Sequence, residues 1–341
     1  MAKLLELRNV TKIFKGGTVA LDDISFSVDS ESPGIIAVAG ESGSGKTTLG
    51  LMVLGFLEPT KGQILYQGKD IKNLTRQESK QFRQEAQAVF QDPFAVYNPF
   101  YKVDHLLEVP VKKFKLANSK DEARDKIIAA MESVGLRPQE ILGRFPHQLS
   151  GGQRQRLVVA RALLLQPKLL IADEPVSMVD ASLRATILES LAKLNKEFGI
   201  PILYITHDLT TAYHVSDYII ILYRGSIMEA GKVETVIKQP QHPYTQLLID
   251  SIPWPDINQK WGQQEIIIPD GSEPKTNHGC KFAPRCPHVM TKCWESPPPL
   301  YKVDSKQIAS CFLYEGQETL SKDHVGDLFT NQSQRVAQVA D

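Results

Sequence analysis

The segment GIIAVAGESGSGKTTLGLMVLGF (residues 34–56) decides the fold of this 341-residue chain. Gly40 is followed by four residues and then by Gly45, Lys46 and Thr47, which is the G-x-x-x-x-G-K-[ST] spacing of a phosphate-binding loop. The apolar run before the loop predicts a strand, and the helical periodicity after it predicts a helix. The segment therefore predicts an α/β fold with a nucleotide-phosphate site, whereas the alternative is a glycine-rich turn that binds nothing.

Residues of this loop are expected to share the work of binding a nucleotide. Backbone N–H groups at a helix start can surround phosphate oxygens. The Lys46 ammonium should meet the β and γ phosphates, and the Thr47 hydroxyl should meet Mg²⁺. The other loop positions expected to contact the nucleotide are Gly40, Glu41, Ser42, Gly43, Ser44, Gly45 and Thr48.

A second apolar strand, in PKLLIADEP (residues 167–175), ends in two carboxylates. Pro167 stops the preceding helix, and the strand is expected over residues 168–172. Asp173 is the expected Mg²⁺ ligand and Glu174 the base that activates water. Side chains of consecutive strand residues point in opposite directions, so the two carboxylates can differ in role only where the chain bends. The alternative is an exposed acidic turn.

A third strand, PILYITHDL (residues 201–209), ends at His207. Its imidazole could reach a γ-phosphate oxygen and take part in catalysis. A single histidine after a strand is more often structural than catalytic, so this prediction depends on the other two segments.

The stretch FPHQLSGGQRQRLVVARALLLQP (residues 145–167) predicts a second anion site. Ser150 and Gln153 have the spacing of a capping box, and the two glycines between them leave the helix start open to an anion. One nucleotide does not need two such sites in one chain. The simplest geometry therefore has this site closing on the nucleotide of another subunit, although an ordinary capped helix is the alternative.

Composition limits the classes of partner. Acidic and basic residues balance at 39 each, and the pI near 7.1 argues against a protein that grips nucleic acid. The amino terminus has no apolar signal-peptide core, and the longest apolar runs are too short to cross a bilayer. We therefore expect a soluble, cytosolic chain, with about two domains from its length.

The chain divides into three predicted parts. Residues 1–90 and 166–238 mix alternating segments with strand–helix units, which predicts a small antiparallel sheet beside a parallel one. Residues 91–165 are mostly helical and predict an inserted subdomain. Its entry loop from Phe94 to Tyr101 is rich in aromatics and suits contact with another protein, but internal packing explains any one of these aromatics equally well.

All four cysteines lie in the remaining part, residues 239–341, at Cys280, Cys286, Cys293 and Cys311. Clustered cysteines in a reducing compartment indicate metal ligands rather than disulfides. The gaps of five, six and seventeen residues fit neither common zinc ribbons nor fingers. Spacing alone leaves Zn²⁺ and an iron–sulfur cluster open, with four unrelated buried thiols as a further alternative.

LSGGQRQR at residues 149–156 resembles the signature of ATP-binding-cassette (ABC) ATPases. The resemblance implies a P-loop, RecA-like core in which Phe14 stacks on adenine, Gln91 contacts Mg²⁺ and the attacking water, and Asp180 crosses between subunits. It also implies a dimer that closes around two ATP molecules. In that dimer the signature of one subunit would face the γ-phosphate held by the other, through Ser150, Gly151, Gly152 and Gln153.

The segments HPYTQLL, SIP, GCKFAPRCPHVMTKCWESPPPL and SCFLY closely resemble the carboxy-terminal extension of oligopeptide and dipeptide importer ATPases. In that family the four cysteines accompany a [4Fe–4S] cluster, which favours iron over zinc here. We expect the cluster to be structural and to lie away from the nucleotide. The resemblance further implies a peripheral position on the cytoplasmic face of the membrane, two membrane-spanning permease subunits and an extracellular solute-binding protein.

EPVSMVDASLR (residues 174–184) looks more like the second of two paralogous ATPases, which implies a heterodimer. Met178 and Val179 replace the Ala-Leu found in many members. Three alternatives stay open: an importer of short oligosaccharides, a soluble cassette ATPase of translation or DNA repair, and a regulatory cassette that does not hydrolyse ATP. The last of these would predict loss of Lys46, Glu174 or His207.

Overall fold

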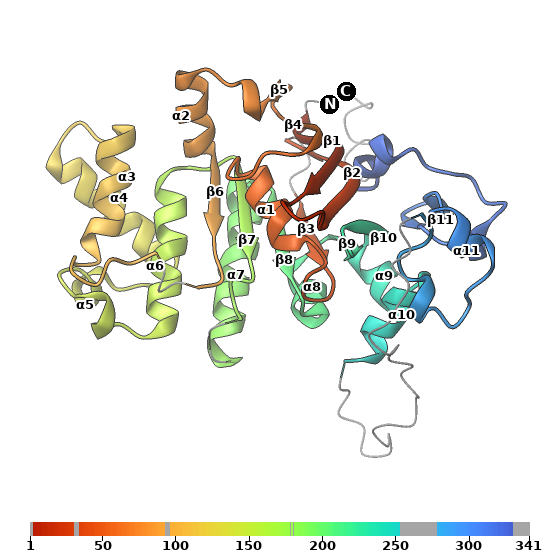
Figure 1. The fold of residues 1–341 in the computed structure, drawn as a ribbon. Coiled ribbons are helices and arrows are strands. Elements are labelled where there is room, and N and C mark those ends of the chain that lie inside the picture. Colours follow the sequence, from red (N-terminus) through yellow and green to blue (C-terminus); the bar gives the residue numbers. More distant parts are fainter. Residues whose placement is uncertain are drawn as a thin grey trace, which may run out of the picture.

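The computed structural model of the chain has two sheets, helices around them and a C-terminal extension on one side (Figure 1). It describes residues 3–30, 34–92, 96–177, 179, 181–252 and 278–329. The strands and helices are, in chain order, β1 (Lys3–Ile13), β2 (Val19–Asp29), β3 (Ile35–Ala39), α1 (Lys46–Val53), β4 (Lys61–Tyr66), β5 (Lys69–Asp70), α2 (Arg76–Glu85), β6 (Ala86–Val89), α3 (Asp104–Phe114), α4 (Lys120–Ser133), α5 (Pro138–Ile141), α6 (Gly151–Leu164), β7 (Leu169–Asp173), α7 (Ala181–Phe198), β8 (Ile202–Thr206), α8 (Leu209–Val215), β9 (Tyr218–Tyr223), β10 (Ser226–Lys232), α9 (Val233–Lys238), α10 (Pro243–Asp250), α11 (Lys292–Glu295), β11 (Tyr301–Asp304) and β12 (Gln307–Ala309).

The larger sheet has the strand order β11-β12-β10-β9-β3-β8-β7-β6. Strands β9, β3, β8, β7 and β6 are parallel, and β10, β12 and β11 extend the sheet in antiparallel fashion. The smaller sheet, β2-β1-β4-β5, is antiparallel throughout. The predicted combination of a parallel sheet with a small antiparallel one is confirmed.

Strand β3 is buried on both faces, which explains its unbroken apolar sequence. Ile35, Ala37 and Ala39 contribute to a core shared with the helices and the extension. The alternate residues, Ile36 and Val38, contribute to a second core beneath the antiparallel sheet. Because successive side chains on a strand point to opposite faces, one short strand joins both cores and holds the loop that follows it rigidly.

Four helices, α3 to α6, follow β6 in the chain and precede β7, and they occupy the left side in Figure 1. Ser119 caps α4 by accepting a hydrogen bond from the Glu122 backbone N–H. Ile127 and Met131 form the buried face of α4, which packs on α6. This arrangement gives the predicted helical insertion.

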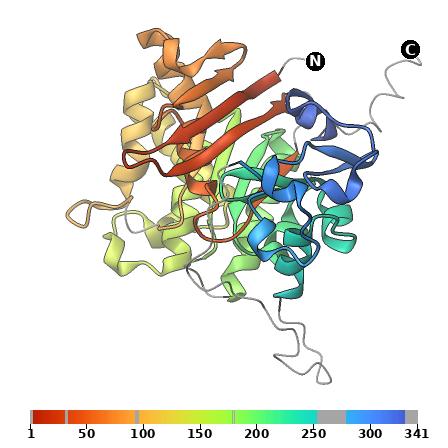
Figure 2. The ribbon, with the colours of Figure 1, turned by 45° about the vertical axis from the view of Figure 1, so that its right-hand side comes forward.

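The C-terminal extension is continuous with the rest of the fold (Figure 2). Strand β12 pairs with β10, so the extension lengthens the main sheet. A 3₁₀ helix, Lys322–Phe329, packs on β2, and Gly326 lies so close that an added Cβ would be 2.0 Å from the Ser27 Oγ. The extension buries Phe282, Ile308 and Phe329 in the two cores that it shares with the rest of the fold.

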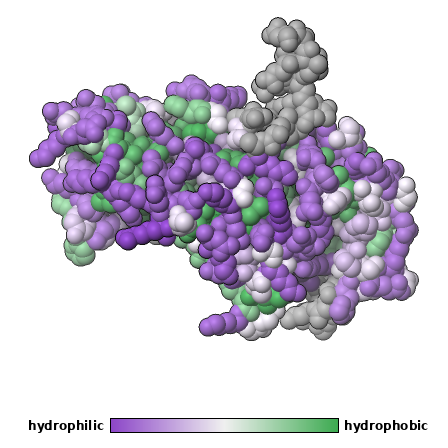
Figure 3. All heavy atoms as spheres, turned by 90° about the horizontal axis from the view of Figure 1, so that it is seen from above, coloured by the Kyte–Doolittle hydropathy of each residue, from purple (hydrophilic) through white to green (hydrophobic). Residues whose placement is uncertain are grey.

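From above, the surface is mostly hydrophilic, with apolar side chains in separate small patches (Figure 3). Within the described residues, no helix combines the length and apolar character that a membrane span requires.

Candidate functional site

The phosphate loop links the end of β3 to the start of α1. Gly40 has a φ of 151°, and an added Cβ there would lie 2.1 Å from the Leu222 carbonyl oxygen. Gly45 has a φ of 105°, with the Ala20 carbonyl oxygen 2.4 Å from the position of an added Cβ. Both positions thus require glycine for conformation and for space, which explains the two glycines of the motif, with four residues between them.

Lys46 is buried inside this loop. Its ammonium donates hydrogen bonds to the carbonyl oxygens of Gly40, at 2.7 Å, and Glu41, at 2.8 Å. Burial lowers the pKa of Lys46, whereas the carboxylates of Glu174, Asp173 and Glu41 raise it. An anionic phosphate in the loop would further favour the charged ammonium.

Asp173 is the last residue of β7 and is buried. Its Oδ1 accepts a hydrogen bond of 3.4 Å from the Thr47 hydroxyl, so two of the three predicted Mg²⁺ ligands lie together. Burial raises the pKa of Asp173 above its ordinary value, and the hydrogen bond from Thr47 only partly offsets this. Hard oxygen ligands beside the phosphate loop fit the usual Mg²⁺ site, in which a carboxylate and the substrate phosphates share the ion.

Glu174 turns the chain away from β7 with a φ of 47°. Its backbone N–H donates to the Ile205 carbonyl oxygen at 2.8 Å, which fixes the turn. The Glu174 Oε1 lies 2.8 Å from Nδ1 of His207, the residue after β8. Because β3, β8 and β7 are adjacent and parallel, their C-terminal ends bring the phosphate loop, His207 and both carboxylates to one edge of the sheet.

The signature segment forms the start of α6. The Ser150 Oγ accepts from the Gln153 N–H at 3.2 Å, and the Gln153 side chain accepts from the Ser150 N–H at 3.0 Å. The predicted capping box is confirmed. Ser150 is exposed, Gly151 is partly exposed and Gly152 is buried, so the helix start is accessible only on the Ser150 side.

Gln91 and Phe14, two further predicted nucleotide contacts, are solvent-accessible. Gln91 is exposed just beyond β6. The Phe14 ring is 40 % exposed, with the Lys12 ammonium 5.5 Å from its centroid. Asp180 and Phe94 lie outside the described residues.

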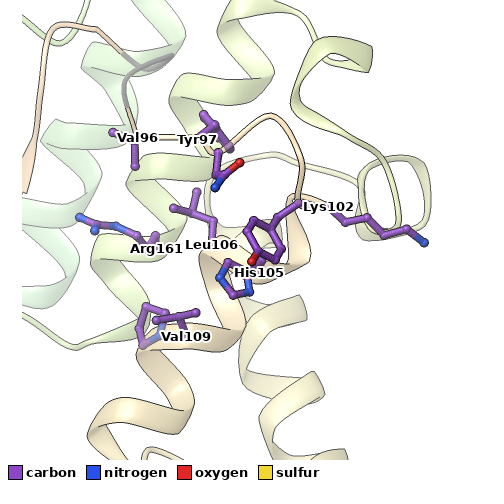
Figure 4. Close-up of a pocket in the computed structure, with 10 residues that line it drawn as sticks. Val96, Tyr97, Lys102, His105, Leu106, Val109 and Arg161 are labelled. Carbon is purple, nitrogen blue, oxygen red and sulfur yellow. The ribbon is translucent and has the colours of Figure 1, made fainter.

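A cavity of about 250 Å³ opens beside the loop that precedes α3 (Figure 4). Tyr97 lies on its wall, but the Tyr97 hydroxyl donates to the Arg154 carbonyl oxygen at 2.8 Å, which ties this ring to α6. Phe100 is 87 % exposed and Tyr101 is 51 % exposed. The structure thus assigns internal packing to Tyr97 and leaves Phe100 and Tyr101 on the surface. The cavity is lined by Val96, Tyr97, Asn98, Tyr101, Lys102, His105, Leu106, Val109, Pro110 and Arg161.

All four cysteines line one enclosed pocket, together with the buried His242. Burial raises the pKa of the Cys280 and Cys286 thiols to about 11, and the neighbouring cysteines add to both shifts. Burial also lowers the pKa of His242 to about 3, so its ring is neutral. Within the described residues, no group of three or more His, Cys, Asp or Glu side chains is arranged to hold a metal ion.

The extension also contacts the phosphate loop directly, which sequence reasoning missed. Arg285, between two of the cysteines, forms an ion pair with Glu41, and the Tyr244 hydroxyl accepts a hydrogen bond from the Glu41 backbone N–H. Glu41 and Arg285 are 244 positions apart, so no local pattern signals the contact. The expected separation of a cluster from the nucleotide stays a prediction, but Arg285, next to Cys286, contacts the residue that follows Gly40.

Comparison with known families gives two matches along the chain. Residues 21–177 match the family described as ABC transporter. Residues 228–293 match the family described as oligopeptide/dipeptide transporter, C-terminal region.

Curated relatives match along nearly their whole length. The oligopeptide transport ATP-binding protein AppF of Bacillus subtilis is 38 % identical, over 91 % of this chain and 97 % of AppF. The dipeptide transport ATP-binding protein DppF of Haemophilus influenzae is 38 % identical, over 86 % of this chain and 88 % of DppF.

Two solved structures share the fold. CbiO1 of Clostridium perfringens, described as part of the ABC transporter complex CbiONQ, has a TM-score of 0.62 and 27 % identity, over 70 % of this chain and 92 % of CbiO1. The ATP-binding cassette MJ0796, solved with ADP and phosphate, has a TM-score of 0.60 and 29 % identity, over 67 % of this chain and 98 % of MJ0796.

Proposed function

Because the chain belongs to the oligopeptide and dipeptide importer branch of the ABC transporter family, it is an ATPase that powers peptide import, and we propose which of its residues carry the reaction. The observation that supports the assignment best is the meeting of Lys46, Asp173, Glu174 and His207 at the ends of three adjacent parallel strands. A non-hydrolysing cassette would have no need for a paired carboxylate and imidazole there.

In the proposed reaction, the phosphate loop and Lys46 bind the β and γ phosphates of ATP. Thr47, Asp173 and Gln91 would hold Mg²⁺, which neutralises charge on the phosphates. Glu174 accepts a proton from the attacking water as it reaches the γ-phosphorus. The His207 contact orients the Glu174 carboxylate, and the imidazole would also reach a γ-phosphate oxygen. Phe14 would stack on adenine.

The signature on α6 is proposed to act on the nucleotide of a partner subunit. Ser150 is exposed at an open helix start, where backbone N–H groups and the helix dipole favour an anion. A paralogous ATPase would supply the reciprocal signature, with Asp180 and Gln153 at the shared interface. The resulting heterodimer would lie peripherally at the cytoplasmic face, under two permease subunits that receive cargo from the solute-binding protein.

The four cysteines are proposed to bind a [4Fe–4S] cluster that cross-links the extension. Four thiols facing one enclosed pocket supply a complete ligand set, and neutral His242 adds no competing charge. The resemblance to the importer ATPases, whose four cysteines accompany such a cluster, is what favours iron over zinc. When bound, the cluster would lock four positions of the extension together.

Purification of the native complex from membranes tests the proposed function. The expected co-purifying chains are a second cassette ATPase, two permeases and a solute-binding protein whose bound cargo is peptide. A bound oligosaccharide would change the proposed cargo but leave the proposed role as a transporter ATPase in place. Co-purification with ribosomes or DNA, and with no membrane protein, would contradict the proposal.

A further inference from the structure

Arg285, a residue of the C-terminal extension, contacts Glu41 of the phosphate loop. It ends the short 3₁₀ helix Ala283–Arg285, immediately before Cys286. Its Nη1 donates to Glu41 Oε2 at 2.9 Å, and its Nη2 donates to Glu41 Oε1 at 3.0 Å. Two parallel charge-assisted hydrogen bonds fix orientation as well as distance.

Glu41 is held at three points. Besides its paired carboxylate, its backbone N–H donates to the Tyr244 hydroxyl at 2.9 Å, and its carbonyl oxygen accepts from the Lys46 ammonium at 2.8 Å. The Ser44 backbone N–H also donates to this carbonyl oxygen at 3.1 Å, and two of the four partners, Arg285 and Tyr244, come from the region after residue 239. The C-terminal region therefore sets the position of the residue next to Gly40.

The surroundings favour a durable pair. The Arg285 side chain is 22 % exposed and that of Glu41 is 38 % exposed. The guanidinium carbon also lies 5.8 Å from the Tyr223 ring centroid and 5.7 Å from that of Phe282, within cation–π range. Partial burial and ring contacts reduce solvent screening, so this pair is stronger than an exposed one.

The charges of the Arg285–Glu41 ion pair bear on ATP binding. The Glu41 carboxylate belongs to the phosphate loop, and without a cation beside it would repel the phosphates of ATP. We infer that Arg285 is a positioning residue for ATP binding: it neutralises Glu41 and holds the loop, so that nucleotide affinity depends on the folded cysteine extension. This inference rests on the proposed role of the loop in binding ATP.

A purely structural role for Arg285 predicts different behaviour. In that case the ion pair would only fasten the extension, and ATP affinity would not respond to the charge at position 41. Lys281 supplies a separate fastening, since its ammonium lies 2.8 Å from Asp22 Oδ2. Loss of Arg285 alone should therefore leave the extension docked.

The test measures the Kd of ATP for the full-length chain and five variants, one of them a control, with melting temperature as the check on folding. Arg285→Ala should raise Kd about ten-fold, because the Glu41 carboxylate then lies unneutralised beside the phosphates of ATP. Arg285→Lys keeps the charge but loses the two paired hydrogen bonds, so its Kd should lie between those of the wild type and Arg285→Ala. Glu41→Gln should lower Kd below the wild-type value, and Arg285→Ala combined with Glu41→Gln should recover most of the lost affinity.

Lys322→Ala is the matched control, because it removes another ion pair between the extension and the core. The Lys322 Nζ lies 2.6 Å from Oδ2 of Asp23, a residue of strand β2. This variant should leave Kd unchanged. An unchanged Kd in a folded Arg285→Ala variant, or no recovery in the double variant, would overturn the inference. If Arg285→Ala does not fold, the inference is overturned by a Kd for Glu41→Gln that is equal to or higher than the wild-type Kd. Absence of ATP binding by the wild-type chain would instead count against the proposed function.

Discussion

Glu174 differs from its neighbour Asp173 because the backbone turns between them. Asp173 ends the strand, is buried and contacts Thr47. Glu174 has a left-handed φ of 47°, which is costly for a residue other than glycine, and its side chain is directed to His207. The turn points the two adjacent carboxylates to different partners, Thr47 and His207, as the proposed division into Mg²⁺ ligand and general base requires.

Glu174→Gln should retain ATP binding and lose hydrolysis by about 10²- to 10⁴-fold, the usual contribution of a general base. The amide keeps the size of the side chain and removes the proton acceptor. Steady-state phosphate release from the reconstituted transporter, with ATP binding measured in parallel, checks this. Glu189→Gln makes the same chemical change on an exposed face of α7 and should have normal activity. Hydrolysis by Glu174→Gln at the rate of that control would remove Glu174 from the role of base.

At the scale of elements, the exposed tip between β6 and α3 is the candidate surface for the membrane subunits. Phe100 is 87 % exposed, whereas Tyr97 is used internally through its hydrogen bond to Arg154. An exposed aromatic beside a cavity is suited to anchoring a partner segment. The composition of this loop predicted a contact surface, but only the structure separates the aromatic that packs inward from those that do not.

Phe100→Ser combined with Tyr101→Ser should uncouple ATP hydrolysis from transport, or release the chain from the complex, because both remove apolar area from the tip. Co-purification with the permeases and the ratio of peptide transported to ATP hydrolysed are the readouts. Phe56→Ser removes a similarly exposed ring, 66 % accessible, just beyond α1 and should change neither. If the double variant also assembles and transports normally, the tip makes no essential contact.

Local sequence predicted the local elements well. The apolar run at 35–39 is strand β3, and the strand expected at 168–172 is β7, one residue later, at Leu169–Asp173. Alternation, glycine geometry and capping act over a few residues, so they can be recognised without tertiary structure. The Arg285–Glu41 pair and the docking of Tyr244 depend on chain segments that meet only after folding, and no periodicity encodes them.

At the scale of the whole molecule, the extension is part of the ATPase sheet. Strands β11 and β12 have four and three residues, too short to show a pattern in sequence, and they gain their place by pairing with β10. Burial of Ile308 and Phe329 in a core shared with β1 and β2 stabilises the extension independently of any cofactor. The cysteine pocket therefore lies in a segment that is already attached on two sides.

Anaerobic purification should yield about four iron and four sulfide per chain with little zinc, as the formula of a [4Fe–4S] cluster requires. Cys286→Ser should lose most of the iron and reduce complex assembly, because one ligand is missing. Met290→Leu alters the same pocket wall without removing a ligand and should keep its iron. Stoichiometric zinc without iron would contradict the [4Fe–4S] cluster but would still support a metal cross-link. A wild-type extension that is folded and free of metal would contradict the cluster and the cross-link alike.

ATP hydrolysis at this site is expected to drive peptide import. Uptake of a labelled oligopeptide into proteoliposomes that contain the complete complex, with ATP on the side of this subunit and solute-binding protein on the other, tests it most directly. We expect uptake that requires hydrolysable ATP and that is lost in the Glu174→Gln complex. Peptide uptake that continues without ATP hydrolysis, or steady hydrolysis with no movement of any peptide offered, would contradict it.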